Sequence, residues 1–445
     1  MKKAVRAIMS IILTIFIIAW PFYVFVIKPI QNSHIEKKEE VQWRGIIKLW
    51  DFPRLDVKTG SRYGWMQEKI KQFERQNPGV YIELTPIDWK KGPIKLEVAL
   101  ETGNVPDIAP IGTDFIYMND SVLEPLEKYF TEEEKREFKY QALSAVTYDK
   151  HMWGVPFMMT TYVMYLNVDM FRQNGVDLPL DGNWTYEDFV EKMQKLTLDT
   201  DNDGKIDQYG FTSFIKPNYY NLWGIILSDG AKIIDEQKMK YVFSGEKAIS
   251  GVNKVVDLKY KYKVTPDDFG ISDENQSWDM FYNKKNVAVY ATGSWATRVL
   301  EEQLLSGEGF EYAIANYPIG ESRLPVSLNN SVGAFGIFKQ QDEKKLDMCV
   351  KFLKFLTQEK YQKDLERLGV FPAKSNIEDM YLNNPKMKRI EDCLSYTTMV
   401  PKHIKWKDID RILQNQIMLA IIGEKTTEEA IDEAKNQINQ IINAN

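Results

Sequence analysis

The sequence contains few of the side chains that most often carry redox or metal chemistry. It has two cysteines, Cys349 and Cys393, and three histidines, His34, His151 and His403, in 445 residues. The histidines are scattered, which argues against a histidine-rich catalytic metal centre. The cysteines could pair only if folding brought them together. The apolar helical pattern around Cys349 favours two free, buried thiols.

Signatures of common enzyme classes are also missing. The chain has no G-x-S-x-G nucleophile elbow, no P-loop and no H-E-x-x-H zinc motif. A glycosidase needs two opposed carboxylates, but among 63 acidic residues some pair can always be nominated. A net charge of −6 without a basic block argues against a nucleic-acid partner. We therefore expect neither catalytic residues nor nucleic-acid binding.

One long hydrophobic run lies at the N-terminus. After Lys2, Lys3 and Arg6, residues 7–27 carry no charge. A helix of this length spans the ~30 Å hydrocarbon core of a membrane. No A-x-A-like cleavage site and no lipid-accepting cysteine follow, which favours an uncleaved anchor over a cleaved signal peptide. The preceding positive charge places the rest of the chain on the extracytoplasmic face of the cell membrane, or outside the cell if the segment is cleaved.

An acidic loop at residues 199–210, DTDNDGKIDQYG, has the spacing of a calcium-binding loop. Carboxylates at alternate positions of a tight turn supply the oxygen ligands that Ca²⁺ prefers. The expected ligands are Asp199, Asp201, Asp203, the carbonyl of Lys205, and Asp207. Gly210 stands where a closing glutamate is usual, which indicates modest affinity. The alternative is an acidic turn without metal, because Asp and Asn favour turns by themselves.

The hydrophobic pattern predicts alternating strands and helices. Strand patterns at 46–50, in YIELTPI and in DIAPI are separated by helical patterns in GWMQEKIKQF and KLEVALETG. This order is typical of a parallel α/β sheet, whose ligands bind at the carboxyl ends of the strands. Further strands are expected in TTYVMYLN, at 286–295 and at 332–338. The length allows two domains.

Aromatic side chains are abundant, at 13% of the sequence, and several fall at predicted strand ends or in polar loops. Flat ring faces suit the apolar face of a sugar, while neighbouring Asp or Arg side chains bond its hydroxyls. For any single tryptophan a place in the core is the more common outcome. For loop tryptophans beside Asp or Arg, such as Trp50 and Trp295, binding site and scaffold are about equally favoured. The aromatics at predicted strand ends or in polar loops are Trp50, Trp153, Tyr219, Tyr220, Trp223, Trp278, Trp295 and Trp406.

Several motifs, in their order and spacing, resemble the extracellular solute-binding proteins of carbohydrate ABC transporters, which are similar in plan to the maltodextrin-binding protein. The motifs are FERQNPGV, NVPDI, WGVPF with YLN, DTDNDGKIDQYGF, FYNKKNVAVYATGSW, VGAFGIF and GVFPAKS. The resemblance covers residues 45–440. The chain departs from the family in lacking the usual lipid-accepting cysteine and in having Asn283-Lys284 in place of Gly-Lys.

The resemblance implies an α/β, two-lobed, periplasmic-binding-protein-like fold with a hinge, here preceded by one N-terminal transmembrane helix. The chain would cross between the lobes near 157–161, 315 and 374. The expected parts are a membrane anchor or signal segment (1–30), a tether (31–44), a first lobe (45–157 plus 316–374) and a second lobe (158–315 plus 375–445). Closure of the lobes by the hinge would enclose the ligand.

The resemblance also implies a binding site between the lobes. The expected ligand-binding residues are Asp51, Arg54, Asp114, Thr160, Tyr220, Trp223, Trp295 and Trp406. The acids and Arg54 would bond hydroxyls, and the tyrosine and tryptophans of the second lobe would be stacking platforms. Ile111 stands where a relative has tryptophan, which argues against a stacking subsite on the first lobe. Family members use the metal loop structurally, away from the sugar.

The implied function is capture of an oligosaccharide or other sugar by a monomer, which delivers it to the permease subunits of an ABC transporter. An alternative is a membrane-anchored sensor that reports occupancy to a kinase or a chemoreceptor. A carbohydrate-active enzyme is a less favoured reading. Calcium, if bound, would be a structural cofactor.

Overall fold

The computed structural model describes residues 19–20, 43–112, 117–329, 332–377 and 380–443. The chain divides into two units, Met1–Gly45 and Ile46–Asn445. Within the described ranges, no helix is both long and apolar enough to cross a membrane. The expected anchor at 7–27 lies outside these ranges except for Ala19 and Trp20, so the anchor and the tether that follows it stay predictions.

A six-stranded sheet has the order β15-β6-β14-β3-β1-β2. Its strands are β1 (Gly45–Asp51), β2 (Val80–Pro86), β3 (Ile108–Ile111), β6 (Val155–Met159), β14 (Val332–Ile337) and β15 (Phe371–Pro372). β1 and β3 run parallel, with Leu49 opposite Ile108. β14 is antiparallel to both β3 and β6. The strands predicted in IIKLW, YIELTPI and DIAPI are confirmed, but the expectation of a parallel sheet is only partly correct. The sheet is mixed, because strands from later in the chain, β6, β14 and β15, join it with antiparallel pairing.

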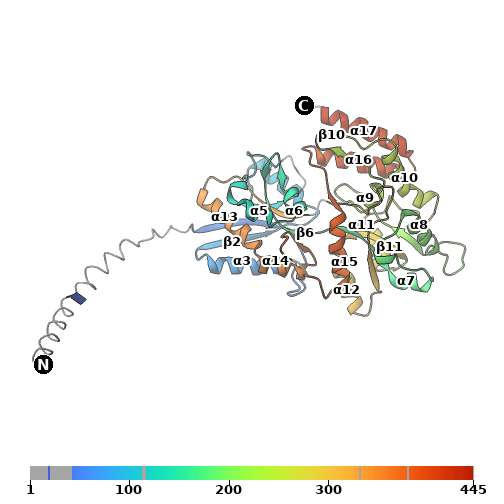
Figure 1. Cartoon of the computed structure of the whole chain (residues 1–445), viewed down its shortest axis with the longest axis horizontal. Helices are drawn as coiled ribbons and strands as arrows, with labels where there is room; N and C mark the ends of the chain where they lie inside the picture. Colours follow the sequence, from blue (N-terminus) through green and yellow to red (C-terminus); the bar gives the residue numbers. More distant parts are fainter. Residues whose placement is uncertain (1–18, 21–42, 113–116, 330–331, 378–379, 444–445) are drawn as a thin grey trace, which may run out of the picture. The chain divides into compact units, whose positions relative to one another are not determined.

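Helices of the same sheet begin and end close to their sequence signals. They are α3 (Gly64–Gln76), α4 (Gly92–Thr102), α5 (Glu132–Arg136), α6 (Tyr140–Ala145), α13 (Glu343–Leu356) and α14 (Glu359–Lys363). The apolar face of α3 packs on α13, where Phe73 meets Phe352 with ring centres 5.1 Å apart. Burial of such faces is the main force that holds a helix to a sheet. Figure 1 shows β2, α3, α13 and α14 gathered together.

A second sheet has four strands in the order β12-β7-β11-β8. They are β7 (Tyr162–Asn167), β8 (Tyr209–Thr212), β11 (Val287–Gly293) and β12 (Tyr312–Ala315). β8 and β11 run parallel, with Phe211 opposite Val289, whereas β7 is antiparallel to β11 and β12. Because β8 and β11 are parallel neighbours, their carboxyl ends meet at one edge of this sheet.

Helices surround this second sheet, as the green to red ribbons of Figure 1 show. They are α7 (Val168–Gln173), α8 (Tyr186–Lys195), α9 (Trp223–Ile226), α10 (Glu246–Tyr260), α11 (Glu274–Tyr282), α12 (Ala296–Leu305), α15 (Pro385–Cys393), α16 (Trp406–Ile421) and α17 (Thr427–Asn443). Thr185 caps α8, because its hydroxyl accepts from Asp188 N at 3.2 Å. The apolar stripe of α17 is buried at Ile431, Ala434 and Ile438.

Shorter elements complete the described fold. They are β4 (Thr147–Tyr148), β5 (His151–Met152), β9 (Ile234–Asp235), β10 (Lys240–Tyr241), β13 (Ser327–Asn329), β16 (Thr397–Met399), and the 3₁₀ turns η3 (Glu127–Tyr129), η4 (Leu180–Gly182), η5 (Asp364–Leu368) and η6 (Leu394–Tyr396). β13 and β16 pair in parallel, with Leu328 opposite Thr398.

The chain passes from one sheet to the other between β6, which ends at Met159, and β7, which begins at Tyr162. It returns between β12 and β14. Residues after β12 still bond to the four-stranded side, since Ile319 N donates to Trp184 O at 2.9 Å. The two sheets with their helices form the two-lobed α/β fold that the resemblance implied. The lobe boundaries given above stay predictions.

Candidate functional site

The carboxyl end of β1 carries a buried ion pair. Asp51, the last residue of the strand, is 2% exposed, and its Oδ1 accepts from Phe52 N at 2.9 Å and from Arg54 Nη1 at 2.8 Å. Burial raises the pKa of Asp51, and the charge of Arg54 opposes that rise. The structure therefore brings together two of the expected ligand-binding residues at the strand end where α/β sheets bind ligands.

An exposed aromatic pair lies beside this ion pair. The rings of Phe52 and Trp89 stack with centres 4.2 Å apart and planes 4° apart, and Trp89 is 56% exposed. The guanidinium carbon of Arg54 is 6.0 Å from the centre of the Trp89 ring. Phe52 and Trp89 were not among the ligand-binding residues expected from the sequence. The sequence pattern could have indicated Trp89, because this residue follows the strand pattern YIELTPI and stands next to an aspartate.

Two other expected residues belong to the first lobe or to the crossing. Thr160 lies half-buried between β6 and β7, and its carbonyl accepts from Asn329 Nδ2 at 2.6 Å. This bond ties the crossing to β13. Asp114 lies outside the described residues, so its role in binding stays a prediction.

Three of the four aromatics expected on the second lobe are packed inside it. Tyr220, Trp223 and Trp406 are 0%, 1% and 1% exposed. The Trp406 Nε1 atom lies 3.3 Å from the Tyr220 hydroxyl, and the rings of Tyr220 and Trp223 meet edge to face with centres 6.5 Å apart. A ring covered by protein on all sides offers no face for stacking, so in this conformation the three serve the core. A ligand-contacting role for them stays a prediction.

Trp295 is the expected aromatic that is exposed. It follows β11 by two residues and is 42% exposed. Its ring lies 5.0 Å from the ring of Trp278, with 58° between their planes. Trp278 in turn stacks on Tyr282 one turn later in α11. A ring that is held from one side and open on the other fits a stacking platform.

A buried carboxyl on α16 was missed by the sequence reasoning. Asp410 is 1% exposed, and burial raises its pKa to about 6. It lies four residues after Trp406 and four before Gln414, so all three occupy the same inward face of the helix. Two polar residues on the apolar stripe of WKDIDRILQNQI are the signal that could have revealed it, because buried polar groups need partners.

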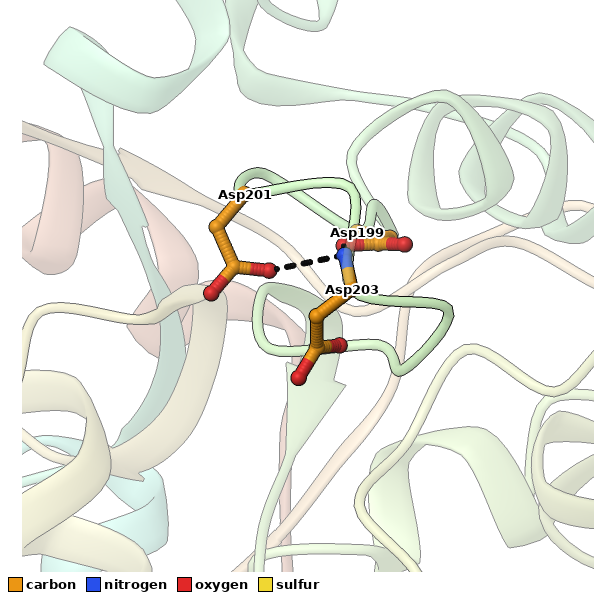
Figure 2. A group of neighbouring side chains, drawn as sticks. All are labelled: Asp199, Asp201 and Asp203. Carbon is orange, nitrogen blue, oxygen red and sulfur yellow. Dashed lines mark hydrogen bonds between the residues drawn. The ribbon is translucent and has the colours of Figure 1, made fainter.

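The acidic loop of the second lobe brings together three of its five expected ligands. Each of Asp199, Asp201 and Asp203 offers a carboxylate oxygen, and these atoms lie within 4.8 Å of one another (Figure 2). Asp203 N donates to Asp201 Oδ1 at 3.1 Å, the dashed line of Figure 2. Gly204 adopts φ +89°, a left-handed conformation that glycine accepts without strain. The cluster has the oxygen chemistry that a hard cation prefers.

The other two expected ligands have a different arrangement. The carboxylate of Asp207 accepts from Thr200 N at 2.9 Å and from Thr200 Oγ1 at 2.7 Å. The bond from the Thr200 side chain lowers the pKa of Asp207. Lys205 N donates to Asp203 Oδ1 at 2.8 Å. The Asp207 carboxylate is thus bonded across the loop to Thr200, whereas Asp199, Asp201 and Asp203 form the cluster of Figure 2.

The two cysteines are buried and unpaired, as expected. Burial raises the pKa of the Cys393 thiol to about 12 and also raises the pKa of the Cys349 thiol. Thiols with such pKa values are protonated at neutral pH. They contribute packing rather than reactivity.

The sequence matches the model of one protein family. The family is described as bacterial extracellular solute-binding proteins, and the match spans residues 68–389. A putative binding protein of Brucella abortus is 23% identical over 404 residues, which cover 87% of this chain and 91% of that protein. A maltooligosaccharide ABC transporter solute-binding lipoprotein of Streptococcus pneumoniae is 22% identical over 401 residues, covering 85% and 86%.

Solved structures show the same fold. An ABC substrate-binding protein of Listeria monocytogenes in complex with cycloalternan superposes with a TM-score of 0.73 at 20% identity, covering 90% of this chain and 99% of that one. A maltose/maltodextrin-binding domain of Bdellovibrio bacteriovorus bound to maltotriose gives a TM-score of 0.72 at 19% identity, covering 89% and 100%. The family match spans well over half of the sequence, and we conclude that the chain belongs to the bacterial extracellular solute-binding proteins.

Proposed function

We propose that this protein binds an oligosaccharide between its lobes and delivers it to the permease subunits of an ABC transporter. The family supports an extracellular solute-binding role. The sugar ligand is supported by the relatives, which are named for maltooligosaccharide or were solved with cycloalternan and maltotriose. The sensor reading has no comparable support among them.

The observation that carries this proposal is that each of the two sheets has an exposed tryptophan ring shortly after the carboxyl end of one of its strands. Trp89 follows the carboxyl end of β2 by three residues, and Trp295 follows that of β11 by two. The Asp51–Arg54 pair at the end of β1 adds hydrogen-bonding groups. Sugar recognition needs this combination, because a pyranose has an apolar face for a ring and a hydroxyl edge for polar groups.

Isothermal titration of the full chain in detergent against maltotriose, cycloalternan and other glycans tests the proposal. We expect saturable binding of at least one glycan. The Trp295→Ala variant should bind that glycan roughly tenfold more weakly, because it removes a stacking face. Tyr140→Ala is the matched control, since Tyr140 is an exposed ring on α6 that does not follow a strand end. No binding in any glycan class would overturn the proposal.

We also propose that residues 7–27 anchor the protein in the cytoplasmic membrane, with the two lobes outside. The support is the length and apolar character of the run, together with the absence of a cleavage motif. Mass spectrometry of the protein from its native membrane decides the matter. An intact N-terminus supports the anchor, and a chain that begins after residue 27 contradicts it.

A further inference from the structure

The turn that follows β8 is held in place by a helix almost 200 residues further along the chain. The turn is tight, because Tyr219 N donates to Lys216 O at 3.1 Å and Asn218 adopts φ +69°. Asn218 N donates to Asp410 Oδ2 on α16 at 2.6 Å. Gln414, one helical turn after Asp410, donates from Nε2 to Tyr219 O at 3.0 Å.

Both oxygens of the Asp410 carboxylate have donors. Oδ2 accepts from Asn218 N, and Oδ1 accepts from Gln414 Nε2 at 2.9 Å. Both α16 side chains are 1% exposed. Burial of a carboxylate is costly unless hydrogen bonds satisfy it. Bonds to an ionised acceptor are also about twice as strong as neutral ones. The buried carboxylate therefore holds the turn on α16 through strong hydrogen bonds that are shielded from water.

The anchored turn connects to the exposed ring of Trp295. Ser277 on α11 donates from Oγ to the carbonyl of Ser213, directly after β8, at 3.4 Å. Burial, followed by the charge of Glu274 on the same helix, raises the pKa of Tyr219 to about 12. Glu274 is the first residue of α11, and Trp278 follows it one turn later. Trp278 contacts Trp295 with ring centres 5.0 Å apart. The segment that α16 anchors is thus linked through α11 to the sheet edge where β11 ends.

We propose that Asp410 is a positioning residue for ligand binding: by anchoring the Lys216–Tyr219 turn to α16, it holds the ring of Trp295 in its binding orientation. This rests on the proposed function, which assigns Trp295 to the ligand. Protonation should weaken the anchor, because a carboxyl group that carries its own proton satisfies one donor fewer. Since the pKa of Asp410 lies at about 6, the turn is held more firmly at pH 7.5 than at pH 5.

Titratable groups near Asp410 could also change their charge with pH, and each has to be considered. The titratable neighbours are Tyr220 in the turn segment and Tyr162 on β7, and burial raises the pKa of both above the ordinary tyrosine value. They stay neutral between pH 5 and 8. Glu274 faces the turn from α11, and burial raises its pKa too. The Nζ cation of Lys216 lies over the Tyr219 ring at 4.9 Å. Mutations of Asp410 and of Glu274 are therefore needed to decide which of the two carboxyls causes a change with pH.

Amide hydrogen exchange at a fixed pH of 7.5 tests the anchor without any ligand. In the full chain, Asp410→Asn should speed exchange of the 216–221 segment by about tenfold, because one of its donors loses an acceptor. Asp408→Asn is the matched control, since Asp408 lies on the same helix, exposed and paired with Arg411. Gln414→Met is a second test should Asp410→Asn fail to fold. Unchanged exchange in the folded Asp410 or Gln414 variant overturns the proposal.

Titration with maltotriose at pH 7.5 and pH 5 tests the link to binding. The wild type should bind about tenfold more weakly at pH 5, and Asp410→Asn should bind weakly at both values. Glu274→Gln should retain the pH dependence. Loss of the dependence in Glu274→Gln, together with its survival in Asp410→Asn, overturns the assignment. If no glycan binds at any pH, the proposed function fails, while the exchange measurement still decides whether Asp410 anchors the turn.

Discussion

At the scale of single residues, the described structure contains several charged groups that are almost completely buried, and each has specific partners. Asp410 is satisfied by a backbone amide and a side-chain amide. Asp56 is fully buried and is paired with Arg367. The pKa shifts of the two carboxyls have opposite signs: burial raises the pKa of Asp410, whereas at Asp56 burial is outweighed by hydrogen bonds, among them those from Arg367, which lower its pKa. Their contributions to stability therefore change with pH in opposite directions.

Asp410 should make the protein less stable as the pH rises. Its pKa is about 6 in the folded state against an ordinary value of 3.8, so the folded protein binds more protons between these values. The stabilising contribution is present below pH 4 and is lost as the pH rises through 6. Relative to Asp410→Asn, the wild type should lose roughly 1 kcal/mol between pH 5 and pH 8. Urea unfolding at both pH values measures this, and a pH-independent difference would contradict it.

Arg367 should be essential to the first lobe. Its Nε donates to Asp56 Oδ1 at 2.7 Å, and its Nη1 donates to Glu68 Oε2 at 2.7 Å. Arg367→Met leaves the buried Asp56 carboxylate without its cation and should cost about 3–5 kcal/mol of unfolding free energy. Lys363→Met is the control, because its pair with Glu359 is exposed and worth less than about 1 kcal/mol. Equal losses in the two variants would contradict the assignment.

At the scale of elements, apolar periodicity correctly predicted which faces of helices are buried. The stripe of α3 at Trp65, Ile70 and Phe73 is an example. Periodicity could not tell which loop aromatics are open. Tyr220 is covered because Trp406, 186 residues later, packs on it. Trp295 stays 42% exposed although the ring of Trp278 contacts it. Local pattern determines the face of an element, whereas the cover over a loop comes from distant segments.

For the acidic loop between α8 and β8, we predict how removal of metal changes the stability of the protein. We propose that Asp199, Asp201 and Asp203 bind Ca²⁺, which stabilises the loop and does not contact the sugar ligand. A cation at 100 times its dissociation constant adds about 2.7 kcal/mol to the free energy of unfolding. Chelation should therefore lower Tm and leave sugar affinity nearly unchanged.

Two variants distinguish the role of the three clustered aspartates from the role of Asp207. Asp203→Asn should abolish the Ca²⁺ dependence of Tm, because it removes a carboxylate from the cluster. Asp207→Asn should retain that dependence, because the Asp207 carboxylate is bonded to Thr200. Thermal unfolding with calcium and with chelator measures both. Loss of the dependence in both variants would make Asp207 a ligand, as the spacing of the sequence first indicated.

At the scale of the whole molecule, contacts between the lobes come from segments that are far apart in sequence. Lys407 on α16 pairs with Glu97 on α4, with Nζ 3.3 Å from Oε2. Arg298 on α12 donates to the carbonyl of Glu366 in η5. We propose that such contacts favour a closed arrangement of the lobes that would enclose a ligand.

The Lys407–Glu97 pair should slow ligand release slightly. Both side chains are about half exposed, so their coupling is less than about 1 kcal/mol and is screened by salt. Glu97→Gln and Lys407→Gln should each raise the dissociation rate up to about fivefold, and the double variant no further. Stopped-flow release of the bound glycan at low and high salt measures this. Strictly additive effects would mean that the two side chains act independently.

The sequence by itself determined strands β1, β2, β3, β7, β11 and β14, the buried helix faces, the fold class and the family, because these depend on local periodicity and on the order of motifs along the chain. It also placed Asp51, Arg54 and Trp295 at strand ends. Only the tertiary structure decided which aromatics are open, that Asp207 bonds to Thr200, and that Asp410 anchors a distant turn. Those outcomes depend on which remote segments pack together, and burial by a remote segment leaves no mark in the local pattern.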